Sequence, residues 1–164
     1  MITLSESSIN QTSPYTISIE SSNDTLTFLT GKGVLYRVGF CEDFSLGIPH
    51  VFQMYIENVC NVKSSFDEKI KQTITCILES FFLSKELTLF YVCDTKDGRQ
   101  SARNRLFYRW FISYHNMKSY TLKNASTEVD GVHFYASILV HKQNPQHDFI
   151  VKSFDDFVVD FEQK

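Results

Sequence analysis

The sequence has little that would indicate a secreted, membrane-spanning or disulfide-bonded protein. Its four cysteines lie far apart and form no Cys-x-x-Cys pair, so neither a disulfide framework nor a zinc site of closely spaced ligands is predicted. No run of about 18 apolar residues occurs, as a membrane helix would need. Residues 1–8 also lack the basic start and apolar run of a secretory signal. We therefore expect a cytoplasmic microbial protein with reduced thiols.

A strong net charge and the common catalytic motifs are also missing. The formal net charge is -3 and the isoelectric point is near 5.9, so nucleic acid or anionic lipid is not an expected partner. No P-loop, dinucleotide-binding glycine pattern or Gly-x-Ser-x-Gly motif occurs. His133 and His141 share one strand face but lie eight residues apart, too far to bind one metal. We predict no metal site.

The chain does have enough apolar residues for one large core. Of its 164 residues, 43% are hydrophobic and 15% are aromatic, which predicts a single domain over residues 14–147. Residues 1–13 are polar and serine-rich and are expected to form a flexible lead-in. Residues 148–164 form an acidic tail with aromatic residues at helical spacing. Docking on the domain or on a second subunit would bury that aromatic stripe.

Alternation of apolar and polar residues predicts four strands in the first third of the chain. Turn residues at 21–24 and 31–33 separate the first three strands, which favours an antiparallel meander. The four predicted strands cover residues 15–20, 25–30, 34–40 and 51–59.

After residue 59 the spacing of apolar residues changes from every second residue to helical spacing, and this change helps to predict the remaining elements. Ser65 and Glu68 form a capping box for a helix that ends near Leu83. Residues 87–93 are almost continuously apolar, as expected for a strand buried on both faces. The next helix carries an apolar stripe, and a hairpin of residues 120–129 and 132–141 turns at Asp130-Gly131. The stripe consists of Ala102, Leu106, Phe107, Trp110, Phe111 and Tyr114.

The predicted order is β-β-β-β-α-β-α-β-β, an α+β (mixed α/β) fold with a mixed sheet. A strand, a helix and a following strand almost always make a parallel crossover, so residues 51–59 and 87–93 are predicted to be parallel neighbours. Their carboxyl ends would place Glu57, Asn58 and Asp94 side by side, where ligands bind in open sheets.

This order, from Thr25 to His141, resembles the fold of the GNAT-type N-acetyltransferases. In that family a glycine-rich loop after the fourth strand binds the coenzyme A pyrophosphate, and a tyrosine on the helix after the fifth strand protonates the departing thiolate. The resemblance implies a GNAT-like sheet with a central parallel pair and acetyl-CoA as the cofactor.

Two departures from that family's motifs indicate that the coenzyme site has been lost. The loop of residues 60–68 contains no glycine, and its two carboxylates in the first helical turn would repel a pyrophosphate. Four residues after Ala102 stands Leu106, so the proton donor is absent or displaced to Tyr108. We therefore expect the fold without a cofactor.

A second resemblance is to an uncharacterised bacterial family known only as a domain of unknown function. The residues that carry it are Tyr91 to Gln100 and Arg103 to Phe111. This resemblance implies no activity.

The segment from Asp94 to Arg109 is the richest in charge, with five cations and two carboxylates. Arginine binds carboxylates and phosphates through a planar fork, so the segment is a candidate anion-binding site. Alternatively, its two aspartates pair with the first two arginines and fix the turn, while the last two arginines form a solvated face. The candidate ligand-binding residues are Asp94, Asp97, Arg99, Arg103, Arg105 and Arg109.

These observations leave two functions open. We favour a non-catalytic binding or interaction module that recognises an anionic ligand or protein partner through residues 94–109, with the acidic tail as a means of homo-oligomerisation. The alternative is a divergent acyl-CoA-dependent N-acyltransferase with Glu57 or Asp94 as base and Tyr108 as proton donor. A strand-end aspartate such as Asp94 would equally serve to cap the following turn.

Overall fold

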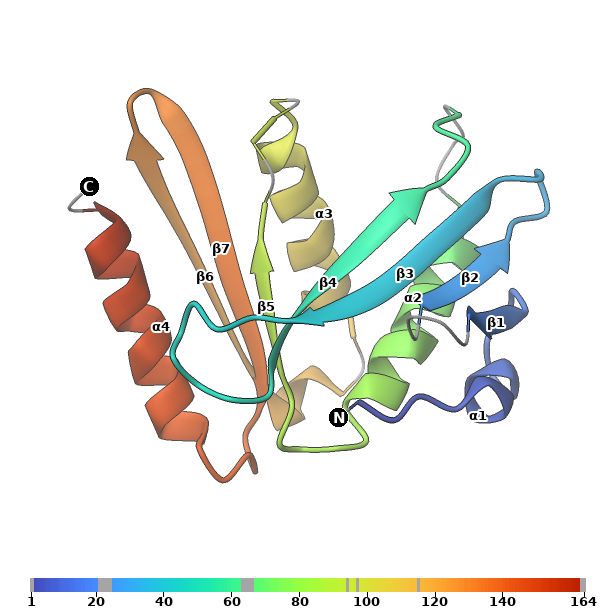
Figure 1. Cartoon of the computed structure of the whole chain (residues 1–164), viewed down its shortest axis with the longest axis horizontal. Helices are drawn as coiled ribbons and strands as arrows, with labels where there is room; N and C mark the ends of the chain where they lie inside the picture. Colours follow the sequence, from blue (N-terminus) through green and yellow to red (C-terminus); the bar gives the residue numbers. More distant parts are fainter. Residues whose placement is uncertain are drawn as a thin grey trace. The chain divides into compact units, whose positions relative to one another are not determined.

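A computed structural model describes residues 2–20, 25–62, 67–93, 95, 96, 98–114 and 116–162 (Figure 1). The predicted order of strands and helices is confirmed, and the described residues also form helix α1 before it, helix α4 after it and the short 3-10 helix η1. The elements are α1 Glu6–Asn10, β1 Ile17–Glu20, β2 Thr25–Leu29, β3 Leu35–Glu42, β4 Val51–Asn58, α2 Glu68–Phe81, β5 Thr88–Val92, α3 Gln100–Ile112, η1 Met117–Ser119, β6 Tyr120–Val129, β7 Val132–His141 and α4 His147–Glu162.

Backbone hydrogen bonds connect the strands in the order β1-β2-β3-β4-β5-β7-β6. The sheet is mixed, because β4 and β5 run parallel while β7 runs antiparallel to both β5 and β6. In the parallel pair, Val51 is aligned with Thr88 and Gln53 with Phe90. The parallel pair predicted from the strand-helix-strand order is therefore confirmed.

The chain divides into two compact units. The first comprises Met1–Cys41 and Met54–Ser84, and the second comprises Glu42–Gln53 and Lys85–Lys164. Strand β4 begins in the second unit and continues into the first, whereas β5, α3, β6, β7 and α4 all belong to the second unit. The single domain expected from the chain length stays a prediction.

In the first unit, the segment expected to be a loose lead-in contains α1. Ile9 is only 2% exposed, although we expected residues 1–13 to contribute little to the core. The Asn10 side chain donates to the Ile17 carbonyl oxygen at 2.8 Å and accepts from the Ile17 amide at 2.7 Å. This pair of bonds ties α1 to the start of β1 through residues seven apart in the chain, a side-chain contact that apolar periodicity does not reveal.

Helix α2 begins later than the capping box predicted, and a different residue caps it. Its N-cap is Asp67, whose carboxylate accepts a hydrogen bond from the Ile70 amide at 2.8 Å. The predicted cap, Ser65, lies outside the described residues. Aspartate and serine are comparable N-cap residues, so the sequence offered two starting points that local preference alone does not separate.

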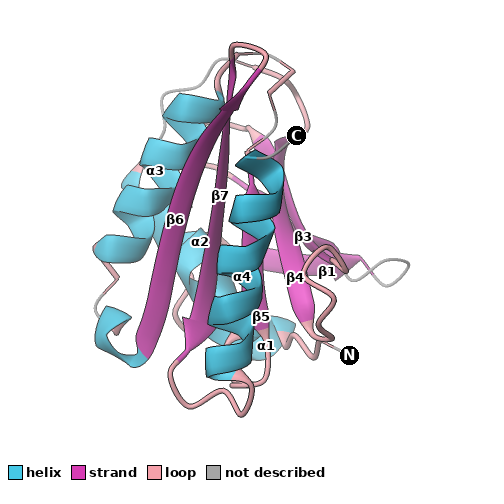
Figure 2. Cartoon of the chain, turned by 90° about the vertical axis from the view of Figure 1, so that its left-hand side faces the viewer, coloured by secondary structure: helices cyan, strands magenta, loops and turns pink. Residues whose placement is uncertain are grey.

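In the second unit, helices α3 and α4 cover opposite faces of the sheet. Neighbouring residues of a strand point to opposite faces. Phe90 of β5 lies against Phe154 of α4, with ring centroids 6.4 Å apart. The next residue, Tyr91, lies against Phe107 of α3, with centroids 4.4 Å apart. The strands β5, β7 and β6 thus form a layer between the two helices (Figure 2).

The hairpin of β6 and β7 has the bounds that the sequence predicted. Asp130 and Gly131 have φ values of 51° and 78°, so both central residues of the turn are left-handed. Such two-residue turns match the twist of antiparallel strands, which explains why an Asp-Gly pair is a strong hairpin signal. The pairing starts directly beside the turn, with Val129 opposite Val132.

A close contact across the first unit gives a test of the structure. Gly39 of β3 lies under the ring of Tyr55 in β4, and a methyl group at Gly39 would overlap that ring. The Tyr55 hydroxyl shares a hydrogen bond with Thr25 Oγ1 at 3.0 Å, which holds the ring in place. We expect Gly39→Ala to lower the free energy of unfolding by about 1–3 kcal/mol, the usual cost of overpacking, as measured by urea denaturation.

The same substitution in a Tyr55→Ala background should cost nothing, because the overlapping ring is gone and alanine suits a strand better than glycine. Gly31→Ala is the matched control, since a methyl group there meets only Tyr15 Oη at an ordinary 3.9 Å. Equal costs of Gly39→Ala in both backgrounds would contradict the described contact.

Candidate anion-binding site on helix α3

Only one face of helix α3 contacts the sheet. The Gln100 side chain donates to the His133 carbonyl oxygen of β7 at 3.2 Å. Phe107 packs on Tyr91 and Phe111 is 5% exposed, the only buried residue of this helix. The remaining side chains are half-buried or exposed, so α3 presents a broad outer face to solvent.

Arg103 lies on the inner side of α3, near Tyr91 and Cys93 of the sheet. Burial raises the pKa of the Cys93 thiol, and the Tyr91 hydrogen bond and the positive charge of Arg103 oppose that rise. Burial, reinforced by Cys93, also raises the pKa of Tyr91 well above its ordinary value. Both groups are therefore neutral at physiological pH, and the positive charge of Arg103 lies close to them.

Arg105 and Arg109 point outward from the same helix. Arg105 donates to Ser101 Oγ at 3.2 Å, one turn earlier on α3. Within the described part of the chain, no carboxylate forms an ion pair with either guanidinium. Four residues apart on a helix, the two arginines lie about 6 Å apart along its axis. Both are thus available to an anionic group from outside the chain.

Apolar side chains surround these two arginines. Leu106 is 38% exposed, Tyr108 is 43% exposed and Ile112 is 53% exposed. We expected Leu106 and Ala102 to belong to the buried stripe, and that expectation was wrong. The stripe that faces the sheet runs instead through positions 103, 107, 111 and 114, and Arg103 occupies a place where we looked for an apolar residue.

The aromatic residues of this region contact one another more than they face solvent. Phe107 lies 5.3 Å from Trp110 and 6.4 Å from Phe111 between ring centroids, and Tyr114 lies 6.1 Å from Tyr120. These contacts indicate that the rings take part in packing between α3 and the sheet.

The other predicted site residues are only partly placed. Arg99 is exposed at the N-cap of α3, and its side chain does not cap the helix. Asp94 and Asp97 lie outside the described residues, so their pairing with Arg99 and Arg103 stays a prediction.

The carboxylate pair proposed for catalysis also stays a prediction. Glu57 accepts from Arg37 Nη1 at 3.0 Å, and both side chains are substantially exposed. Asn58 donates to the Val62 carbonyl oxygen at 2.9 Å and therefore serves the local turn. Tyr108, the proposed proton donor, is on the outer face of α3.

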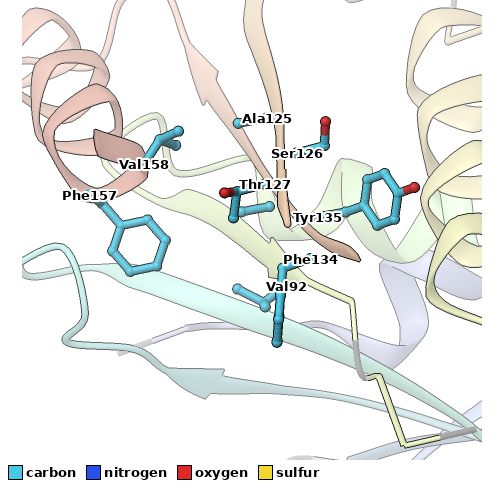
Figure 3. Close-up of a pocket in the computed structure, with 9 residues that line it drawn as sticks. Val92, Ala125, Ser126, Thr127, Phe134, Tyr135, Phe157 and Val158 are labelled. Atoms are coloured by element: carbon cyan, nitrogen blue, oxygen red, sulfur yellow. The ribbon is translucent and has the colours of Figure 1, made fainter. Parts of the chain in front are cut away.

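The second unit contains a small apolar pocket between α4 and the hairpin (Figure 3). Its volume is about 30 Å³, room for a single water-sized molecule, so an ordinary ligand does not fit. No charged residue lines it. The lining residues are Val92, Ala125, Ser126, Thr127, Phe134, Tyr135, Ala136, Phe157 and Val158.

A more polar hollow of about 250 Å³ lies where the loops before β4 and β5 meet the loop after β7. Its charged or ionisable lining residues are His50 and Glu86, both exposed to solvent. Among the residues that the structure describes, no three His, Cys, Asp or Glu side chains gather to hold a metal ion. No described helix is long and apolar enough to cross a membrane.

Comparison with protein families gives a match over much of the chain. Residues 66–156, more than half of the chain, match a family described only as a family of unknown function (DUF6169). No curated protein and no solved structure matches the chain. The likeness to acetyltransferases therefore rests on the order of the elements alone.

The environment of Cys93 gives a further test. Cys41 and Cys60 are exposed, whereas Cys93 is 1% exposed and its pKa is raised by burial. At about pH 8 the buried thiol therefore has a smaller thiolate fraction than an ordinary cysteine. We expect iodoacetamide to alkylate Cys41 and Cys60 while leaving Cys93 unmodified, as peptide mass spectrometry would show. Alkylation of Cys93 as fast as Cys41 in the folded protein would contradict this environment.

Proposed function

Because the chain belongs to this family of unknown function, we propose a role from its own residues: a non-catalytic binding module that recognises an anionic partner through α3. The observation that carries the proposal is the outward pair Arg105 and Arg109, which no described carboxylate neutralises. Arg99 extends the same basic segment at the start of the helix, and Arg103 lies on its inner side near Cys93.

The surroundings of the arginines favour a protein partner over a small anion. Neither Arg105 nor Arg109 lines either of the two hollows described above. Exposed Leu106, Tyr108 and Ile112 would instead pack against apolar side chains of a partner. Interfaces between proteins commonly combine arginine and aromatic side chains in this way. The partner would be an acidic surface or segment that also carries apolar residues.

The setting of this interaction would be the cytoplasm. All four cysteines are free, and Cys41 and Cys60 are exposed to solvent. Exposed free thiols persist in compartments that keep cysteines reduced.

Binding can be tested with poly-L-glutamate as an anionic probe. Trp110, the single tryptophan, lies on α3 next to Arg109, so its fluorescence reports on this surface. We expect Arg105→Ala/Arg109→Ala to weaken binding about 2- to 30-fold, because each exposed ion pair contributes about 0.2–1 kcal/mol. Binding by the unchanged chain should also weaken as salt is added.

The matched control is Lys69→Ala/Lys142→Ala, which removes two exposed cations from other elements. This control should bind poly-L-glutamate as tightly as the unchanged chain. Circular dichroism should show that both double variants are folded. Loss of the fold in the arginine variant would mean that the arginines are structural, and equal weakening by both variants would mean that only bulk charge matters.

A divergent acyl-CoA-dependent N-acyltransferase is the second candidate. The observation in its favour is the parallel pair β4 and β5 with α2 between them in the chain, the order found in GNAT-type enzymes. The start of α2 argues against coenzyme binding. Burial would raise the pKa of Asp67, but hydrogen bonds from the Ile70 amide and the Tyr15 hydroxyl lower it overall. A carboxylate thus already occupies the helix end that a pyrophosphate would need.

We therefore expect neither coenzyme A nor acetyl-CoA to raise the melting temperature. A ligand present at about 100 times its dissociation constant adds about 2.7 kcal/mol of stability, which a thermal shift assay detects. A clear rise with either compound would favour the acyltransferase and argue against the binding module.

A further inference from the structure

The outer face of α4 carries the opposite charge to the outer face of α3. Asp156 and Asp160 are exposed, and among the described residues no cation forms an ion pair with either carboxylate. The other aspartates of this helix are engaged: Asp155 pairs with Lys123 of β6, and Asp148 accepts from the His147 ring. Lys152 is the one cation in the sequence of α4.

Apolar side chains flank these two carboxylates as well. Phe149 is 58% exposed and Val159 is 49% exposed, whereas Ile150 and Phe154 are buried against the sheet. Phe149 lies seven residues, about two turns, before Asp156 and therefore on the same side of the helix. Lys152, exposed and four residues before Asp156, lies on this face too, so the two carboxylates leave it with a net negative charge and an apolar border. The outer face of α3 is basic with an apolar border.

The two faces match in spacing and point in opposite directions. Arg105 and Arg109 are four residues apart, as are Asp156 and Asp160, so each pair of charges lies about 6 Å apart along its helix. Because α3 and α4 cover opposite sides of the same layer of strands, one chain cannot bring the two faces together (Figure 2). A second copy can.

We propose that the outer face of α3 in one copy binds the outer face of α4 in a second copy, with Arg105 and Arg109 paired to Asp156 and Asp160. This inference rests on the proposed function and names the partner: an acidic, apolar-bordered helix of the same protein. The exposed Tyr108 and Ile112 then pack near Phe149 and Val159, which covers apolar surface on both copies.

Such a contact joins two different surfaces and leaves one of each free at the ends of the assembly. Contacts of this kind extend head to tail into longer chains of copies unless a ring closes. Exposed ion pairs are individually weak, so the assembly is reversible and grows with protein concentration. Salt weakens it, since the Debye length falls from about 30 Å at 0.01 M to about 8 Å at 0.15 M.

The test is sedimentation velocity of the full chain over a range of concentrations at these two ionic strengths. We expect the weight-average sedimentation coefficient to rise with concentration at low salt and to rise less at high salt. Arg105→Glu/Arg109→Glu makes both outer faces acidic, and Asp156→Lys/Asp160→Lys makes both basic. Each variant alone should therefore stay monomeric.

Mixing the two variants should restore assembly, because each acidic face then meets a basic one. The single chain that carries all four substitutions should assemble by itself for the same reason. Lys69→Glu/Lys142→Glu is the matched control, since it changes the net charge as much as the α3 variant and leaves both faces intact. It should assemble like the unchanged chain.

The outcomes separate this inference from the proposed function. If the unchanged chain stays monomeric at every concentration while poly-L-glutamate still binds through Arg105 and Arg109, self-pairing is overturned and the anion-binding role stands. If folded single-face variants still assemble, or if their mixture does not, the assigned faces are wrong. Should a charge reversal unfold the chain, the corresponding alanine variants replace it, and assembly of these variants as strong as that of the unchanged chain overturns the pairing.

Discussion

The burial of β5 on both faces is the constraint on which the second unit depends. Phe90 and Tyr91 are neighbours in the chain, yet one packs on α4 and the other on α3. A strand with apolar side chains on both sides must be covered on both sides. The two helices are therefore fixed as a pair, and whatever charge each carries on its outer side is presented away from the other.

The periodic elements of the fold could be read from the sequence because a local pattern determines each of them. The Asp130-Gly131 turn needs two left-handed residues, and few other pairs supply them. The almost uninterrupted apolar run of β5 likewise predicted a strand that is buried on both faces. The parallel pairing with β4 followed from a general rule of chain handedness rather than from any residue.

Features that depend on particular side-chain contacts between elements could not be read in this way. The two bonds between Asn10 and Ile17 order α1, but nothing in residues 1–13 indicates them. The side of α3 that faces the sheet was predicted wrongly for a related reason. The apolar residues of α3 are spread around the helix, so the sequence pattern was consistent with several buried stripes. Only the position of Tyr91 beneath Phe107 selects the stripe that faces the sheet, and that selection turns Arg105 and Arg109 outward.

Strand β6 ends the row of strands that the structure describes, so none of those strands pairs with its outer backbone groups. A ten-residue strand in this place is a template on which other chains could add strands and grow fibrils. Its side chains counter this: Lys123 and Glu128 are charged, and Lys123 and Thr121 are bound to Asp155 and His147 of α4. Charged and engaged side chains of this kind disfavour the addition of a further strand at the sheet edge, and the helices are then the surfaces better suited to reversible contact.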